Sequence, residues 1–235
     1  MIRSVRSLGV ALLVVTAAVG CTGGDGGDGG GAQPDGAQLI QKASEATRQV
    51  ETIRFALDVD GQIPGISVAG AEGQLTKEGN VKGTVVITAT GQPSEAEFVI
   101  VGDTLYLKGP TGGFQQLPSS VAASVYDPTK ILDDNLGLAA LVAGATEPAV
   151  QGKETVDGVD AYRVKVKFAK NNLGVLLPGV VTDSDLPGEL WIAVAEPNRP
   201  VKARVEVPAA AGAQGGTVTI TLTEFNNPVT ITPPA

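Results

Sequence analysis

The 235-residue chain contains no histidine, a single cysteine and few aromatic residues, and these shortages narrow the chemistry open to it. Without histidine there can be no Ser-His-Asp triad, no histidine metal ligand and no histidine switch near neutral pH. Because Cys21 is the only cysteine, the chain cannot form an intrachain disulfide or a zinc or iron–sulfur site built on several cysteines. Aromatic residues make up 4%, whereas single-stranded nucleic acids are bound on aromatic stacking platforms.

The charge balance and the motifs speak against nucleic acid as a partner and against catalysis. There are 17 basic and 25 acidic residues, a net charge of −8. No G-x-S-x-G motif occurs. Ser119 or Ser120 could form a Ser–Lys dyad with Lys130, but the S-x-x-K spacing that would support such a dyad is absent. An esterase or transferase would need a nucleophile beside a base, and none is visible. We therefore expect no enzymatic activity, no cofactor and no metal ion.

The first residues have the pattern of a secretory signal that ends at the cysteine. Arg3 and Arg6 precede an apolar run, Leu8–Val19, which is shorter than the about 20 residues needed to span a bilayer. The segment Ala18-Val19-Gly20-Cys21 resembles a lipobox, the site at which bacterial lipoproteins are acylated and cleaved. The alternative is an ordinary signal peptide that ends near a cysteine by chance. The pattern predicts a signal peptide over residues 1–20 and an exported protein anchored through acyl chains on Cys21.

Residues 21–36 read CTGGDGGDGGGAQPDG, which is typical of a flexible tether. The tether contains a formal G-x-G-x-x-G from Gly24 to Gly29, but without a preceding strand this spacing does not indicate a dinucleotide site. Asp25 and Asp28 are too few ligands for calcium. The folded part is therefore expected to be a single domain over residues 37–235.

That domain should begin with one helix and continue mainly as strands. Asp35 and Gln38 have the spacing of a capping box, and apolar residues follow at helical spacing until about Glu51. Beyond this point apolar and polar residues alternate, as in Tyr162–Phe168, over roughly nine or ten strands. Such alternation predicts an antiparallel sheet with one apolar and one polar face. The simplest interpretation of the basic run Arg163, Lys165 and Lys167 is a solvated face.

Three further segments are expected to be helical. Asp127-Pro128 fits an N-cap followed by proline, and the segments 135–145 and 171–181 are short and strongly apolar. They have too little polar surface to lie exposed, so they should cover the apolar face of the sheet. The fold class is α+β, a curved sheet capped by helices. From composition alone, the aliphatic residues are expected to fill a closed core.

Several segments together resemble the LppX/LprA/LprF/LprG family of mycobacterial lipoproteins, and its LprG branch most closely. With the lipobox and the leading helix, the resemblance covers nearly the whole domain in order. Its most specific part is the YDP…NLGLA…L stretch. The segments that carry it are VDGQIPGIS (59–67), EAEFVIVGDTLYL (95–107), VYDPTKILDDNLGLAALVA (125–143), ELWIAVAE (189–196) and TVTITLTEFNNPVTITPP (217–234).

This resemblance implies a half-open antiparallel sheet similar to the LolA/LolB carriers, a curved half-barrel with helices on its concave face around an apolar cavity. It implies cargo with several acyl chains, such as triacylated glycolipids, phosphatidylinositol mannosides or triacylglycerol, moved across the envelope of an actinobacterium. The protein would sit on the outer face of the cell membrane, facing the cell wall, and could receive its cargo from a membrane lipid transporter. The alternative is a non-enzymatic envelope interaction lipoprotein with a closed core.

On this interpretation the alternating apolar positions become the wall of a lipid pocket. Val85 matches the middle of a central strand in the family pattern, so it is the first choice for a change that blocks the pocket. The strand residues expected in the wall are Phe55, Leu57, Val59, Val85, Ile87, Phe98, Ile100, Leu105, Val164, Val166 and Ile192. The residues expected on the helical side are Leu136, Leu138, Leu141, Leu173 and Leu176.

Overall fold

The computed structural model describes residues 33–88, 92–118, 127–177, 180, 182–209 and 214–235, and residues 33–235 form one compact unit. The predicted signal peptide, the predicted acylation site Cys21 and most of the predicted tether lie outside the described residues. No helix in the described part of the chain is long and apolar enough to cross a membrane.

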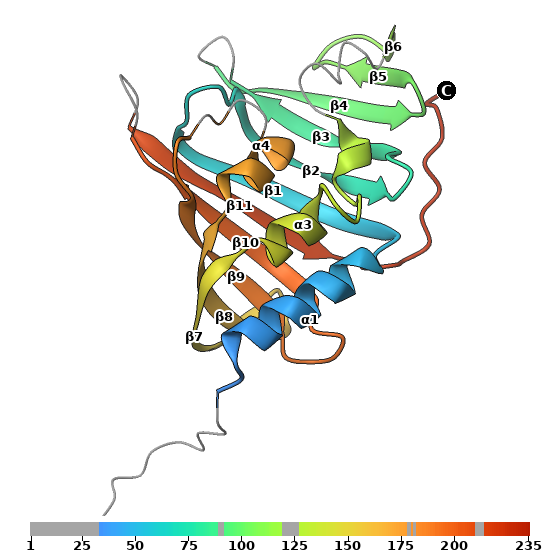
Figure 1. Cartoon of the computed structure of the whole chain (residues 1–235). Coiled ribbons are helices and arrows are strands. Elements are labelled where there is room, and N and C mark those ends of the chain that lie inside the picture. The colour runs from blue at the N-terminus through green and yellow to red at the C-terminus, as the bar shows by residue number, and fades with distance from the viewer. Residues whose placement is uncertain (1–32, 89–91, 119–126, 178–179, 181, 210–213) are drawn as a thin grey trace, which may run out of the picture. The chain divides into compact units, whose positions relative to one another are not determined.

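The domain is built on one antiparallel sheet of eleven strands, in the order β6-β5-β4-β3-β2-β1-β11-β10-β9-β8-β7 (Figure 1). The first six strands form one wing and the last five the other. The wings meet where β1 pairs with β11, so that Phe55 lies opposite Leu222 and Leu57 opposite Ile220. The strands are β1 (Thr52–Gln62), β2 (Val68–Thr76), β3 (Val81–Ile87), β4 (Ser94–Val101), β5 (Thr104–Lys108), β6 (Gln115–Pro118), β7 (Thr146–Val156), β8 (Val159–Phe168), β9 (Leu186–Ala193), β10 (Pro200–Val207) and β11 (Gly215–Thr223).

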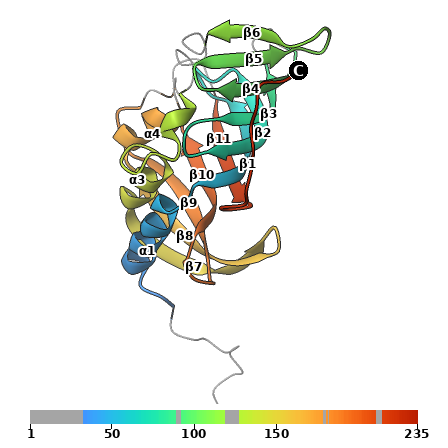
Figure 2. The same ribbon diagram turned by 90° about the vertical axis from the view of Figure 1, so that its right-hand side faces the viewer.

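The helices lie together on one face of this sheet, which curves around them (Figure 2). They are α1 (Gly36–Arg48), the 3-10 turn η1 (Pro128–Lys130), α3 (Leu138–Ala143) and α4 (Lys170–Leu176). The Asp35 side chain caps α1 by accepting the Gln38 N–H at 2.9 Å, as its spacing predicts. The curved antiparallel sheet with helices on its concave face confirms the predicted fold class.

The observed elements differ from the predicted ones mainly at their ends. The described residues contain eleven strands rather than roughly nine or ten, and α1 ends at Arg48 rather than near Glu51. Glu51 instead lies just before β1, where its backbone N–H donates to the Asn226 side-chain oxygen and its carbonyl accepts the Lys77 backbone N–H. The two apolar helices are also shorter than predicted, being α3 and α4.

The hydrophobic core lies between the helices and the concave face. One cluster lies under α1, α3 and α4 against β8–β11, and it contains Phe168, Leu173 and Ile192 at 0–1% exposure. A second cluster joins the end of α1 to β1–β4 around Leu75 and Val81. Both clusters therefore rest on the concave face of the sheet.

Candidate functional site: the concave face of the sheet

The register of the strands fixes which side chains share the concave face. Residues directly opposite each other on antiparallel strands point to the same side of the sheet. Three cross-strand rows result for β1–β4: Ile53, Leu75, Val81 and Ile100; Phe55, Gly73, Gly83 and Phe98; Leu57, Ala71, Val85 and Ala96. The predicted strand positions in this wing therefore lie on one face.

The half of this face formed by β8–β10 is closed by the helices. Val164, Val166 and Ile192 are exposed by 2% or less, and Leu173 of α4 and Leu141 of α3 pack into the same cluster. Side chains enclosed in this way fill one another's space. These five predicted wall residues are brought together as a packed core.

The half formed by β1–β5 is covered less completely. Seven of the predicted wall residues are only half-buried in the described structure, namely Phe55, Leu57, Val59, Val85, Ile87, Phe98 and Leu105. Ile100 and Leu138 of the same set are buried in the second cluster, and Leu176 of α4 touches both clusters. The apolar face therefore continues beyond the packed core along β1–β5, with its side chains partly accessible.

This accessible half has a floor of small residues, which sequence reasoning missed. Gly73 and Gly83 stand opposite each other between Phe55 and Phe98. A Cβ atom on Gly83 would lie 2.0 Å from the Glu72 carbonyl oxygen, so β2 and β3 approach too closely there for a side chain. Ala71 and Ala96 flank Val85 in the next row. A glycine within a strand signals a close approach, but only the register shows which glycines meet.

One predicted wall residue is placed differently. Leu136 is 47% exposed, so it does not lie in the apolar interior that its spacing predicts. The Asp133 carboxylate accepts the N–H groups of Asn135 at 2.8 Å and of Leu136 at 2.9 Å, which makes a turn ahead of α3. The helix then begins at Leu138, so Leu136 precedes it and points outward.

Polar side chains hold the helices against each other. Ser44 of α1 donates to the Ala139 carbonyl at 3.1 Å, and the Asn172 amide of α4 donates to the Ala140 carbonyl at 2.8 Å. Both bonds reach backbone oxygens of α3, which thus lies between α1 and α4. This arrangement positions the apolar faces of three short helices over the sheet.

Two ionisable groups with shifted pKa values, Lys77 and Asp127, lie next to elements of the second cluster. Lys77 contacts Asp134 at 3.2 Å and Glu51 at 3.6 Å, and the hydrogen bond to Asp134 raises the pKa of the lysine. The Thr129 hydroxyl donates to Asp127 at 2.6 Å and lowers the pKa of that carboxyl. Within the described ranges no group of three or more acidic or cysteine side chains could hold a metal ion.

The buried polar residues of the described structure are Ser44, Thr47, Thr76 and Asn198.

Two hollows on the surface lie away from the concave face. One of about 350 Å³ lies over the outer side of β1–β4 and includes Arg54, Lys82 and Phe114. The other, of about 450 Å³, lies between α1 and the start of β7 and includes Ile40 and Pro148. The cavity predicted between sheet and helices remains a prediction.

The domain belongs to the class of open, curved antiparallel sheets whose apolar concave face is partly covered by helices. The family model of the LppX_LprAFG lipoproteins matches residues 35–231, and the chain belongs to this family. This finding confirms the resemblance drawn from the sequence segments.

Individual relatives are similar along most of the chain. The lipoarabinomannan carrier protein LprG of Mycolicibacterium smegmatis is 31% identical over 86% of this chain and 84% of its own length. The LprG of Mycobacterium tuberculosis is 25% identical over 99% of this chain and 95% of its own. The crystal structure of LprF from Mycobacterium bovis shares the fold with a TM-score of 0.75 at 24% identity, and the match covers 88% of this chain and all of the chain in that structure.

Proposed function

We propose that this protein is a membrane-anchored lipoprotein that binds lipids with several acyl chains on its concave face and carries them across the cell envelope. The observation that carries the proposal is the row of half-buried apolar side chains on β1–β5, which continues the core without being fully covered. The relatives named lipoarabinomannan carriers support a glycolipid as cargo. A triacylated glycolipid or a lipid like triacylglycerol would fit, with its headgroup near solvent.

Acyl chains need only a dry surface of sufficient size. Each methylene withdrawn from water contributes about 0.8 kcal/mol, so a chain of about 15 methylenes gains about 12 kcal/mol before the costs of ordering are subtracted. The described concave face offers aliphatic and aromatic carbon at Phe55, Leu57 and Phe98, with the glycine pair between them. Such a surface holds chains of different length because it makes no hydrogen bond to them.

A second candidate is an envelope interaction lipoprotein whose core is closed. The full burial of Val164, Phe168 and Leu173 under the helices favours it, because that half leaves no room for a ligand. Native mass spectrometry of the compact unit 33–235, produced in an actinobacterial host, decides between the two. We expect co-purifying lipid of defined mass. A clean apo mass, with no uptake of offered diacyl or triacyl lipids, would support the closed core and contradict the carrier.

The anchor is a separate part of the proposal with its own test. We expect that Cys21→Ser in the full chain moves the protein from the membrane fraction to the soluble fraction and removes the mass of the acyl groups. The reason is that Cys21 carries the only thiol of the chain, and a lipobox attaches its lipid to the cysteine thiol. Ser44→Ala, on α1, is the control and should stay with the membrane. Retention of the Cys21→Ser variant in the membrane fraction would contradict the acyl anchor.

A further inference from the structure

Five basic side chains gather on the outer, convex face of the last wing of the sheet. The register places Lys165 of β8 and Arg204 of β10 on either side of Glu189, and Arg163 and Lys202 on either side of Trp191. The basic residues alternate along β8 and β10 with core residues such as Val164 and Val205, so their side chains point away from the helices. The outer basic surface consists of Arg163, Lys165, Lys167, Lys202 and Arg204.

Two of the five cations form ion pairs in the described structure. Arg163 binds Glu189 at 2.7 Å and Lys167 binds Glu147 at 2.7 Å. Among the residues with described positions, no acidic oxygen lies within 4.0 Å of the three other cations, Lys165, Lys202 and Arg204.

Two further carboxylates lie near this surface. Glu154 accepts the Trp191 indole N–H, and Glu206 lies two residues beyond Arg204 on β10. Within β7–β10 the five cations therefore face four carboxylates, and Asp58 of β1 lies on the same face beyond Thr219. Over these four strands the surface carries a small excess of positive charge in a chain with a net charge of −8.

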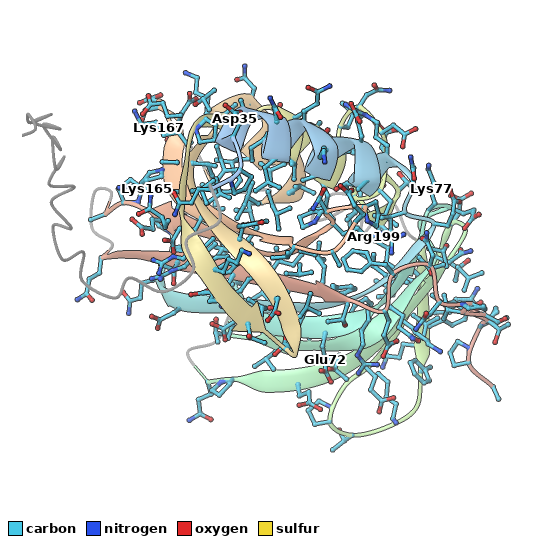
Figure 3. The ribbon with its side chains drawn as sticks, turned by 90° about the horizontal axis from the view of Figure 1, so that it is seen from below. Asp35, Glu72, Lys77, Lys165, Lys167 and Arg199 are labelled. Carbon is cyan, nitrogen blue, oxygen red and sulfur yellow. The ribbon has the colours of Figure 1, made fainter. Side chains whose placement is uncertain are left out.

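The outer basic surface adjoins the point where the chain enters the domain. Gly36, the first residue of α1, lies so close to β7 that a Cβ atom there would be 2.9 Å from the Pro148 carbonyl oxygen. Pro148 follows Glu147, the partner of Lys167, and the next residue of β7 pairs with Lys165. Figure 3 shows Asp35, Lys165 and Lys167 on the same side of the molecule.

The proposed anchor brings this side to a membrane. Twelve residues lead from Cys21 to Gln33, the first described residue. A glycine-rich segment of that length has an end-to-end distance of about 20 Å. A domain held on so short a tether meets the bilayer repeatedly with the side from which the tether leaves, and the tether keeps its local concentration high.

We propose that the outer basic surface docks on anionic lipid headgroups and so orients the tethered domain, with the convex side of β8–β10 toward the bilayer. The proposal rests on the acyl anchor proposed above. Lysine and arginine near an anionic bilayer each add a modest attraction that salt weakens. Such contacts bind the domain weakly to an anionic surface, and they select an orientation once the anchor has placed the domain there. The concave face then stays open to incoming and outgoing lipid.

Vesicle co-sedimentation tests the docking without the anchor. The unit 33–235 is mixed with vesicles of phosphatidylcholine alone or with 40% phosphatidylglycerol. We expect binding to the anionic vesicles only, and loss of that binding when salt rises from about 50 to about 500 mM. The triple variant Lys165→Gln, Lys167→Gln and Arg204→Gln should bind the anionic vesicles at least about tenfold more weakly. Because no acyl group is present, failure here is distinct from failure of the anchor.

The control is a matched triple substitution at basic residues on the other wing of the same convex face. Arg54→Gln, Lys82→Gln and Lys108→Gln also remove one arginine and two lysines, one of them paired at 2.7 Å, here with Glu97. This variant should bind as the unchanged domain does. Equal weakening by both triples, equal binding to neutral vesicles or no binding at all would overturn the proposal. Lipid loading in the first triple should be unchanged, which separates docking from the carrier function.

Discussion

Val85→Trp is expected to reduce lipid loading at least about tenfold while the domain stays folded. Val85 is half-buried at the middle of β3 on the concave face, with Ala71 and Ala96 as its cross-strand neighbours. An indole there can lie over the two alanines, and it occupies the space proposed for an acyl chain. Displacing only two methylenes costs about 1.6 kcal/mol, which is more than a tenfold loss of affinity. Native mass spectrometry of the purified variant measures the fraction that carries lipid.

The adjacent valine provides the control for this change. Val86 lies on the same strand and is also half-buried, but it pairs with Gly70 and Glu95 and so points to the opposite face. Val86→Trp should leave loading unchanged, and both variants should unfold cooperatively near the midpoint of the unchanged protein. If Val85→Trp carries as much lipid as Val86→Trp at equal stability, Val85 does not line the ligand site.

The faces of the sheet could be predicted from the sequence, but the neighbours of each strand could not. Alternation of apolar and polar residues assigns Phe55 and Val85 to one face because side chains alternate along a strand. It does not show that the first strand pairs with the last, which brings Phe55 opposite Leu222. That pairing closes the sheet between its wings and decides which apolar residues become core. The sequence pattern therefore predicted a single apolar wall where the structure has a packed half and an accessible half.

Interrupted alternation explains why β2 and β7 are hard to recognise in the sequence and why sequence reasoning missed the floor of small residues. β2 carries Gly70 and Gly73, and β7 carries Pro148 and Gly152, so neither strand shows a continuous pattern of apolar residues. Glycine and proline weaken the strand signal although they are tolerated at bulges and edges. β7 is the edge of its wing and has bulges at both interruptions. In β2 the glycines serve the close approach to β3, and this makes the floor of the accessible half.

The substitution of phenylalanine by alanine, made once in each half at Phe168 and Phe98, should distinguish the packed half from the accessible half. Phe168 of β8 is 0% exposed, and its ring lies so close to Gly188 that a Cβ atom there would be 2.5 Å away. Phe168→Ala removes a ring whose space the neighbours cannot fill, and we expect it to lower the free energy of unfolding by about 3–5 kcal/mol. In a domain of this size that lowers the unfolding midpoint by roughly 10 °C, measured by circular dichroism.

Phe98→Ala removes the same ring from the accessible half. Phe98 is half-buried on β4 beside Gly83, and part of its surface already faces open space. Its removal therefore leaves little enclosed void, and we expect a loss of stability of about 1 kcal/mol, with lipid loading reduced because the ring is proposed to contact the acyl chains. If Phe98→Ala destabilises the apo domain as strongly as Phe168→Ala and leaves loading intact, both rings belong to a closed core. A stable Phe98→Ala domain that has lost its lipid places the ligand on β1–β5, because the loss of lipid then cannot be explained by a loss of folding and reports a lost contact of the ring with the ligand.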